Sequence, residues 1–246
     1  MKLAGKTDVG SLRSENQDNY RAARLQDDTV WAVVCDGMGG AASGKLAAQI
    51  ATDTMEACFE AGLRGLQRGQ ERAFLQHCIT QANRAIYENA EQGPENRGMG
   101  TTVVCCLVRQ GELHIVHVGD SRAYLCRSGQ LTQLTKDHSM VQQLVETGKL
   151  TSEEAENYPR KNLITRALGV ERGVTADYTT VPVKTGDMVL LCSDGLTGMV
   201  EDEQILAVMQ HTPFFGAPRR LIEEALKAGG QDNITAVLIE IEQPED

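Results

Sequence analysis

Residues 30–37 read VWAVVCDG, an apolar run that ends abruptly in an aspartate and a glycine. The same pattern returns at residues 114–121, HIVHVGDS, and at residues 188–195, MVLLCSDG. A fourth aspartate, Asp232, instead comes just before the apolar run 234–239. Short apolar runs bounded by turn residues are typical of buried β-strands. We therefore expect four strands that each carry a carboxylate at one end.

The position of these aspartates predicts a cation site. Strand ends are rigid and could hold Asp36, Asp120, Asp194 and Asp232 around one point. Carboxylates that are gathered in this way repel one another unless a cation lies between them. A ligand set made only of oxygens suits Mg²⁺ or Mn²⁺ rather than Zn²⁺. The placement of charge alone thus indicates a metal-dependent enzyme.

The bulk properties of the chain exclude several other classes of protein. The formal net charge of −10 argues against a general nucleic-acid binder, which needs a basic surface. The apolar runs are far shorter than the roughly 20 residues of a membrane helix, and the N-terminus lacks a signal peptide. We therefore expect a cytoplasmic protein, monomeric and without a membrane partner. The seven cysteines have no metal-ligand spacing, which indicates reduced, buried thiols.

The order of the expected elements indicates an α+β fold. No linker rich in Pro, Gly or Ser divides the 246 residues, so we expect one domain over residues 1–242 and a frayed tail at 243–246. The absence of regular β–α alternation argues against a doubly wound parallel sheet and favours antiparallel sheets with helices outside. Strands are expected at about 3–9, 29–35, 101–108, 112–118, 122–127, 130–134, 174–181, 187–193 and 233–241, and helices at about 43–61, 70–91, 201–210 and 217–228, with Ser43 as an N-cap.

Residues 139–170 differ from their surroundings. They are polar and mixed, and they hold two short helical patterns, at about 139–147 and 151–157, between segments that predict strands. We interpret this stretch as an inserted flap that governs the choice of substrate.

Six short motifs occur along the chain in a fixed order, and together they resemble the bacterial branch of the metal-dependent protein phosphatases (type 2C). One such motif would mean little, because Asp-Gly is a common turn, but six in order span nearly the whole chain. The resemblance implies a four-layer α-β-β-α sandwich in which helices flank two mostly antiparallel sheets. The motifs are RSENQD (13–18), DGMGG (36–40), GMGTT (98–102), VGDSR (118–122), SDGL (193–196) and DN (232–233).

The resemblance also implies roles for individual residues around two Mn²⁺ or Mg²⁺ ions and a possible third. Asp36 would bridge the two core ions, and the Gly37 carbonyl, Asp194 and Asp232 would complete their protein ligands. Asp18 would hold waters on the second ion, Asp120 would bind the third ion, and Arg13 would clamp the phosphate.

These roles imply a serine/threonine phosphoprotein phosphatase. Two neighbouring ions can lower the pKa of a shared water, and the resulting hydroxide can attack phosphorus directly. The planar fork of Arg13 can bind two phosphoryl oxygens. The partners would be phosphoserine and phosphothreonine proteins, the products of a serine/threonine kinase.

Some positions depart from the pattern of the family. Many bacterial members carry His where this chain has Ala41, and an acidic residue where it has Lys45. The sequence therefore leaves two candidates for the general acid, a metal-bound water and His138. The departures motivate an alternative function, a catalytically weak or inactive regulator that binds phosphoproteins. Hydrolysis of small phosphate esters is a third alternative, but no Gly-rich loop of nucleotide-binding spacing is present.

Each candidate residue also has an ordinary structural interpretation. Asp18 could form an Asx turn, and Asp36 and Asp194 could be turn residues at strand ends. Asp120 could cap a helix or pair with Arg122. Arg13 could be a surface cation. A chance origin for the whole ordered set is improbable, which favours the metal site.

Overall fold

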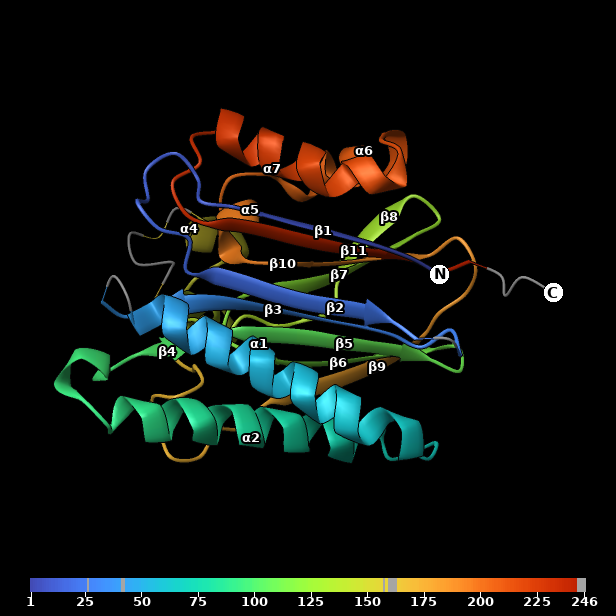
Figure 1. The fold of residues 1–246 in the computed structure, drawn as a ribbon. Coiled ribbons are helices and arrows are strands. Elements are labelled where there is room, and N and C mark those ends of the chain that lie inside the picture. Colours follow the sequence, from blue (N-terminus) through green and yellow to red (C-terminus); the bar gives the residue numbers. More distant parts are fainter. Residues whose placement is uncertain (26, 41–42, 157, 159–162, 243–246) are drawn as a thin grey trace.

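The computed structural model describes residues 1–25, 27–40, 43–156, 158 and 163–242. Within these residues the chain forms four layers, helices, sheet, sheet and helices (Figure 1). The predicted α+β sandwich is therefore confirmed. The expected tail at 243–246 and the departure at Ala41 lie outside the described residues.

In the described part of the chain, both sheets are built only from antiparallel strand pairs. The first sheet has the order β1 (Lys2–Asp8), β11 (Ile234–Glu240), β10 (Met188–Cys192), β7 (Arg122–Arg127) and β8 (Gln130–Gln133). The second has the order β2 (Asp18–Arg24), β3 (Val30–Met38), β5 (Val103–Arg109), β6 (Glu112–Val118) and β9 (Asp177–Pro182), with β4 (Gly100–Thr101) paired to the end of β3.

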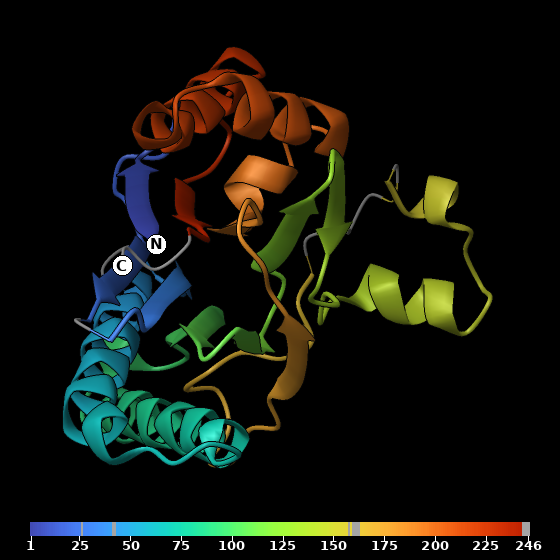
Figure 2. The same cartoon turned by 90° about the vertical axis from the view of Figure 1, so that its right-hand side faces the viewer.

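Helices cover the outer face of each sheet. The long antiparallel helices α1 (Ser43–Gly62) and α2 (Glu71–Ala90) lie on the second sheet, while α5 (Asp194–Thr197), α6 (Asp202–His211) and α7 (Ala217–Lys227) lie on the first (Figure 1). The short helices α3 (Met140–Glu146) and α4 (Ser152–Glu156) project from one side of the sandwich, as Figure 2 shows. Short 3₁₀ turns occupy Leu63–Gly65, Pro94–Asn96 and Phe214–Gly216.

Three apolar layers hold the sandwich together, and β3 contributes to two of them. Trp31 and Val33 point toward α1 and α2, where the Trp31 ring stacks on Phe59 at 4.6 Å. Ala32 and Val34 point the other way, into the layer between the two sheets. Because both faces of β3 are buried, the strand is apolar throughout instead of alternating. The third layer lies between the first sheet and α5, α6 and α7.

Most predicted elements are confirmed, with bounds that differ by at most three residues. One strand was missed, because β2 reads DNYRAAR and has no apolar alternation. Its position at the edge of the second sheet leaves most of it half exposed, so an apolar face is not required there. The predicted cap at Ser43 is wrong, because Ser43 lies within α1 and its hydroxyl donates to the Gly40 carbonyl at 3.0 Å.

Candidate active site

Antiparallel pairing brings the aspartates to one end of the sandwich. Asp18 begins β2 and lies directly opposite Asp36 in the register of β2 and β3. Asp194 follows β10 and begins α5, and Asp232 comes two residues before β11, the strand that pairs with β10. Asp120 lies just beyond the end of β6. The α5 end of the sandwich lies away from the N-terminus (Figure 1).

The pKa values of these carboxylates report how closely they are gathered. Burial raises the pKa of Asp36 well above its usual range, and the charges of the other four aspartates raise it further. The pKa of Asp18 is raised to about 7 by burial and then by Asp194 and Asp232. Burial and the charge of Asp194 raise the pKa of Asp120 to about 8. Asp194 shifts in the same direction, through burial and Asp232. The five carboxylates therefore form one electrostatic cluster.

Hydrogen bonds that cross between the two sheets fix Asp18. Its Oδ2 accepts from Ser193 Oγ and from Thr235 Oγ1, each at 2.6 Å. Ser193 Oγ in turn accepts from the Thr235 amide at 2.9 Å. Ser193 follows β10 and Thr235 lies in β11, so that the first sheet orients an aspartate of the second.

Asp36 is fixed through its backbone. Thr102 Oγ1 accepts from the Asp36 amide at 3.1 Å, and the Thr102 amide donates to the Asp36 carbonyl at 2.9 Å. Thr101 Oγ1 donates to the same carbonyl at 2.8 Å. Thr102 Oγ1 also lies 2.7 Å from Ser121 Oγ, which connects this support to the turn that carries Asp120.

A close backbone approach lies next to Asp36. A Cβ atom on Gly37 would lie 2.1 Å from the Gly44 carbonyl oxygen and 2.7 Å from that of Gln17. The start of α1 can pack against this strand end only because Gly37 has no side chain.

Arg13 borders the cluster from a loop that Asn233 holds in place. The Arg13 Nη2 donates to Asp232 Oδ2 at 2.8 Å, and this bond raises the pKa of the guanidinium. The Arg13 side chain is 56% exposed, so that an incoming anion could reach it. Asn233 Oδ1 accepts from the Gln17 amide at 2.8 Å, and its Nδ2 donates to the Glu15 carbonyl at 3.0 Å.

The cluster fits divalent cations. Asp18 Oδ1 and Asp194 Oδ1 are both buried, and neither has a hydrogen-bond partner within the described part of the chain. A buried carboxylate oxygen without a partner is costly, and a bound cation would satisfy it. The donor set is made of carboxylate oxygens, which suits Mg²⁺ or Mn²⁺. Asp18, Asp36, Asp194, Asp232 and Asp120 could therefore hold such ions.

A second group of potential ligands fits a metal less well. Single ligand atoms of His117, His138 and Asp177 all lie within 4.8 Å of one another. However, the Gly119 amide donates to His138 Nδ1 at 3.1 Å, which leaves the ring proton of neutral His138 on Nε2. A metal ligand must offer a lone pair, so binding at Nε2 would require the loss of this bond.

His138 is also poorly suited to act as the general acid. The residue is 5% exposed, and burial, His117 and Arg166 lower its pKa to about 4. It is therefore neutral at neutral pH. Lys45, the departure from the family pattern that lies among the described residues, is exposed near the start of α1.

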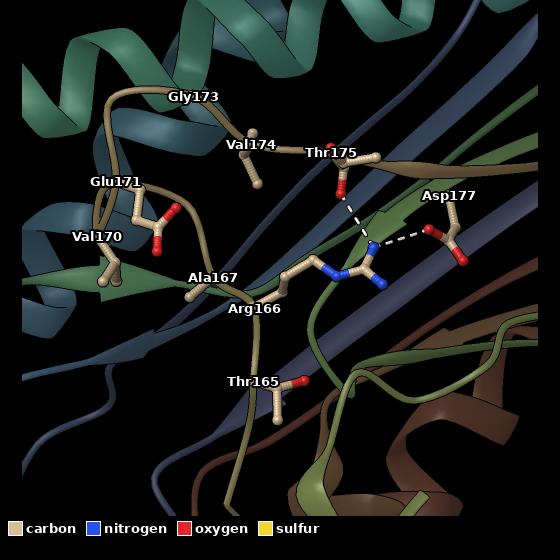
Figure 3. A pocket seen from close by; sticks show the side chains of 9 residues that line it. All are labelled: Thr165, Arg166, Ala167, Val170, Glu171, Gly173, Val174, Thr175 and Asp177. Atoms are coloured by element: carbon tan, nitrogen blue, oxygen red, sulfur yellow. Dashed lines mark hydrogen bonds and ion pairs between the residues drawn. The ribbon is translucent and has the colours of Figure 1, made fainter. Parts of the chain in front are cut away.

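A pocket of about 470 Å³ lies beside β9, and none of the seven predicted site residues lines it. It is formed mainly by the segment that returns from the flap, as Figure 3 shows. Arg166 reaches across it and donates to Asp177 Oδ1 at 2.8 Å and to the Thr175 carbonyl at 3.1 Å. The same segment pairs with β4, since the Leu168 amide donates to the Thr101 carbonyl at 2.8 Å. The pocket thus adjoins the support of Asp36 without being part of the carboxylate cluster.

Several residues that support the site had no role in the sequence analysis. The bonds of Thr101, Thr102, Ser193, Thr235 and Asn233 depend on which strands are neighbours, and the local sequence does not reveal this. The sequence holds one indication that these residues support the site: four of the five lie within the motifs GMGTT, SDGL and DN.

Comparisons with known proteins identify the family of the chain. Residues 12–238 match the family model described as protein phosphatase 2C. The chain belongs to this family. It is 38% identical to the serine/threonine phosphatase Stp of Listeria monocytogenes, over 96% of this chain and 94% of that protein. The chain is accordingly a protein serine/threonine phosphatase.

Solved structures of phosphatases in this family share the fold. Staphylococcus aureus Stp1 is 36% identical, with a TM-score of 0.93 over 98% of this chain and 95% of that one. The catalytic domain of PstP in complex with two manganese ions is 37% identical, with a TM-score of 0.87 over 98% of each chain. No helix among the described residues is both long and apolar enough to cross a membrane.

Proposed function

We propose that this phosphatase depends on Mn²⁺ or Mg²⁺ and that Asp36, Asp194 and Asp232, with the Gly37 carbonyl, hold two core ions. Asp18 would orient waters on one of these ions, and Asp120 would bind a third. The observation that carries the proposal is that Asp18 Oδ1 and Asp194 Oδ1 are buried inside a cluster of five carboxylates and have no hydrogen-bond partner among the residues that the structure describes. The two manganese ions in the related PstP structure support the proposed dependence on a divalent cation.

The protein residues would perform binding and orientation. When bound, the ions would acidify a water so that it can attack phosphorus at neutral pH. Arg13 would exchange its bond with Asp232 for bonds to two phosphoryl oxygens, because its guanidinium is exposed beside the cluster. The hydrogen bonds from Ser193 and Thr235 would keep the Asp18 carboxylate oriented throughout.

The substrates would be phosphoserine and phosphothreonine proteins that an opposing serine/threonine kinase modifies. The net charge of −10 disfavours nucleic acid as a partner. We further propose that residues 1–242 act as one domain, as a monomer in the cytoplasm.

Phosphate release from a phosphothreonine peptide, with and without Mn²⁺, tests the proposal. We expect turnover that requires Mn²⁺ and stops when EDTA is added. Calorimetry with Mn²⁺ on the same sample separates the alternatives, because an inactive phosphoprotein-binding regulator could lack tight metal binding. Absence of metal-dependent turnover in a folded protein that also fails to bind Mn²⁺ would refute the proposal.

A further inference from the structure

His138 makes hydrogen bonds to Gly119, the residue that precedes Asp120, although it lies 19 positions after Gly119 in the chain. The Gly119 amide donates to His138 Nδ1 at 3.1 Å, and the His138 amide donates back to the Gly119 carbonyl at 2.9 Å. Both backbone polar groups of Gly119 are therefore bonded to one residue. The other side of Gly119 is closed by Thr102, whose Cγ2 would lie 2.6 Å from a Cβ atom at this position.

Gly119 has a φ of +107°, a backbone conformation that favours glycine. The chain turns here from the end of β6 toward Asp120. A glycine in such a turn has wide conformational freedom, so the direction of the next residue depends on how the turn is held. The two bonds to His138 and the contact with Thr102 remove that freedom.

His138 is itself rigidly held. Its ring is buried and stacks on His117, with the ring centroids 4.7 Å apart and the planes at 19°. Its carbonyl accepts from the Thr165 amide at 2.7 Å, and its Nε2 lies 3.4 Å from Asp177 Oδ2. These contacts tie it to the segment that returns from the flap.

We propose that His138 is a positioning residue, which fixes Gly119 and thereby holds the Asp120 carboxylate beside Asp194. Its role would be that of an outer-shell partner, which acts through Asp120 and touches neither ion nor substrate. This inference rests on the proposed metal-dependent function. It assigns to the unusual buried pair of histidines a role in binding the third ion rather than a metal site of their own.

The first test needs no substitution and no metal. Nitrogen-15 NMR of the histidine side chains in the metal-free protein would identify the tautomer of His138. We expect the proton on Nε2 and an unprotonated Nδ1 that is coupled to the Gly119 amide nitrogen through the hydrogen bond. A proton on Nδ1 would overturn the proposal, because the Gly119 amide would then have no acceptor.

Two substitutions of His138 test the consequence. In His138→Asn the side-chain oxygen occupies the place of Nδ1 and can accept from Gly119, whereas His138→Leu offers no acceptor. We expect Gly119 amide exchange and the Mn²⁺ concentration for half-maximal phosphate release to stay near wild type in the Asn variant. In the Leu variant we expect the Gly119 amide to exchange faster. The Mn²⁺ concentration for half-maximal phosphate release should rise about tenfold, as is typical for the loss of an outer-shell partner. His114→Leu is the matched control, since His114 is a buried histidine of β6 that bonds to Tyr178 and not to Gly119.

The Asp120→Ala background provides the decisive comparison. If His138 acts through Asp120, His138→Leu should cause no further loss of turnover or Mn²⁺ affinity there. A full additional loss of turnover or Mn²⁺ affinity, or an Asn variant as impaired as the Leu variant, would contradict the proposal.

Should the Leu variant fail to fold, His138→Gln replaces it, because its amide reaches the Nε2 position and leaves Gly119 without an acceptor. Failure of the wild type to release phosphate would refute the proposed function, while the NMR result would still decide the hydrogen bond.

Discussion

Burial beside other carboxylates raises the pKa of Asp18 to about 7 and that of Asp120 to about 8. An unfolded aspartate has a pKa near 3.9. The folded, metal-free protein therefore binds more protons than the unfolded chain between these values. Its stability must fall as the pH rises through this range, because the repulsion between carboxylates grows as they ionise.

This reasoning predicts the effect of Asp120→Asn on the metal-free protein. The variant removes one ionising group from the cluster and so loses less stability than the wild type as the carboxylates ionise. The free energy of unfolding of the variant minus that of the wild type should therefore increase as the pH rises from about 4 to about 8. Since one pKa unit corresponds to about 1.4 kcal/mol, we expect a relative gain above about 1 kcal/mol at the upper end. Urea unfolding in EDTA measures it. A difference that does not depend on pH would contradict the shift.

A second residue-scale prediction separates Asp36 from Asp120. The charges of all four other aspartates raise the pKa of Asp36, so Asp36→Asn should abolish turnover and tight Mn²⁺ binding together. Asp120→Ala should leave two ions bound and slow phosphate release by about tenfold to a hundredfold. Calorimetry with Mn²⁺ and rate measurements on both variants test the division. Equal loss of metal binding in the two variants would show that it is wrong.

At the scale of elements, the sequence predicted the helices and strands that have a clear local pattern of apolar residues. The helices α1 and α2 followed from apolar residues at helical spacing, and β3 from an apolar run that is buried on both faces. The strand β2 could not be predicted, because its half-exposed position at the edge of the sheet requires no apolar alternation. The positions of the aspartates at strand ends could be predicted from the sequence. The cross-sheet partners of Asp18 were not, because they depend on which strands pair.

The junction of β3 and α1 gives a prediction at this scale. Gly37→Ala would place a methyl group 2.1 Å from the Gly44 carbonyl oxygen, so the helix start must move away from the strand end. We expect a loss of about 1–3 kcal/mol in the free energy of unfolding, with weaker Mn²⁺ binding. Gly65→Ala is the matched control, because nothing lies within 4 Å of a Cβ atom there. Wild-type stability of Gly37→Ala would contradict the close approach.

The flap carries a further prediction. In the flap, α3 and α4 project from the sandwich (Figure 2), and residues 165–170 contribute to the pocket (Figure 3). The Leu168 amide there donates to the Thr101 carbonyl of β4. Exchange of the flap with that of a related phosphatase should change the preference among phosphopeptides more than the hydrolysis of p-nitrophenyl phosphate. Only a peptide is long enough to contact the flap. A change of equal size for both substrates would argue against a role in substrate choice.

At the scale of the whole molecule, the four layers explain how remote residues meet. One apolar layer holds the two sheets face to face, and two others hold the helices on their outer faces, so that the strand ends of both sheets meet at one end of the sandwich. Ser193 and Thr235 of the first sheet bond Asp18 of the second. The sandwich thus assembles acidic side chains that would repel one another in any looser arrangement, and a bound cation would offset that repulsion.

The most direct test of the account is X-ray diffraction from crystals grown with Mn²⁺, because anomalous scattering locates manganese independently of any assumption about the site. We expect two strong anomalous peaks among Asp36, Asp194 and Asp232, and a weaker third peak beside Asp120. Absence of peaks at these carboxylates, or a peak found only between His117, His138 and Asp177, would contradict it.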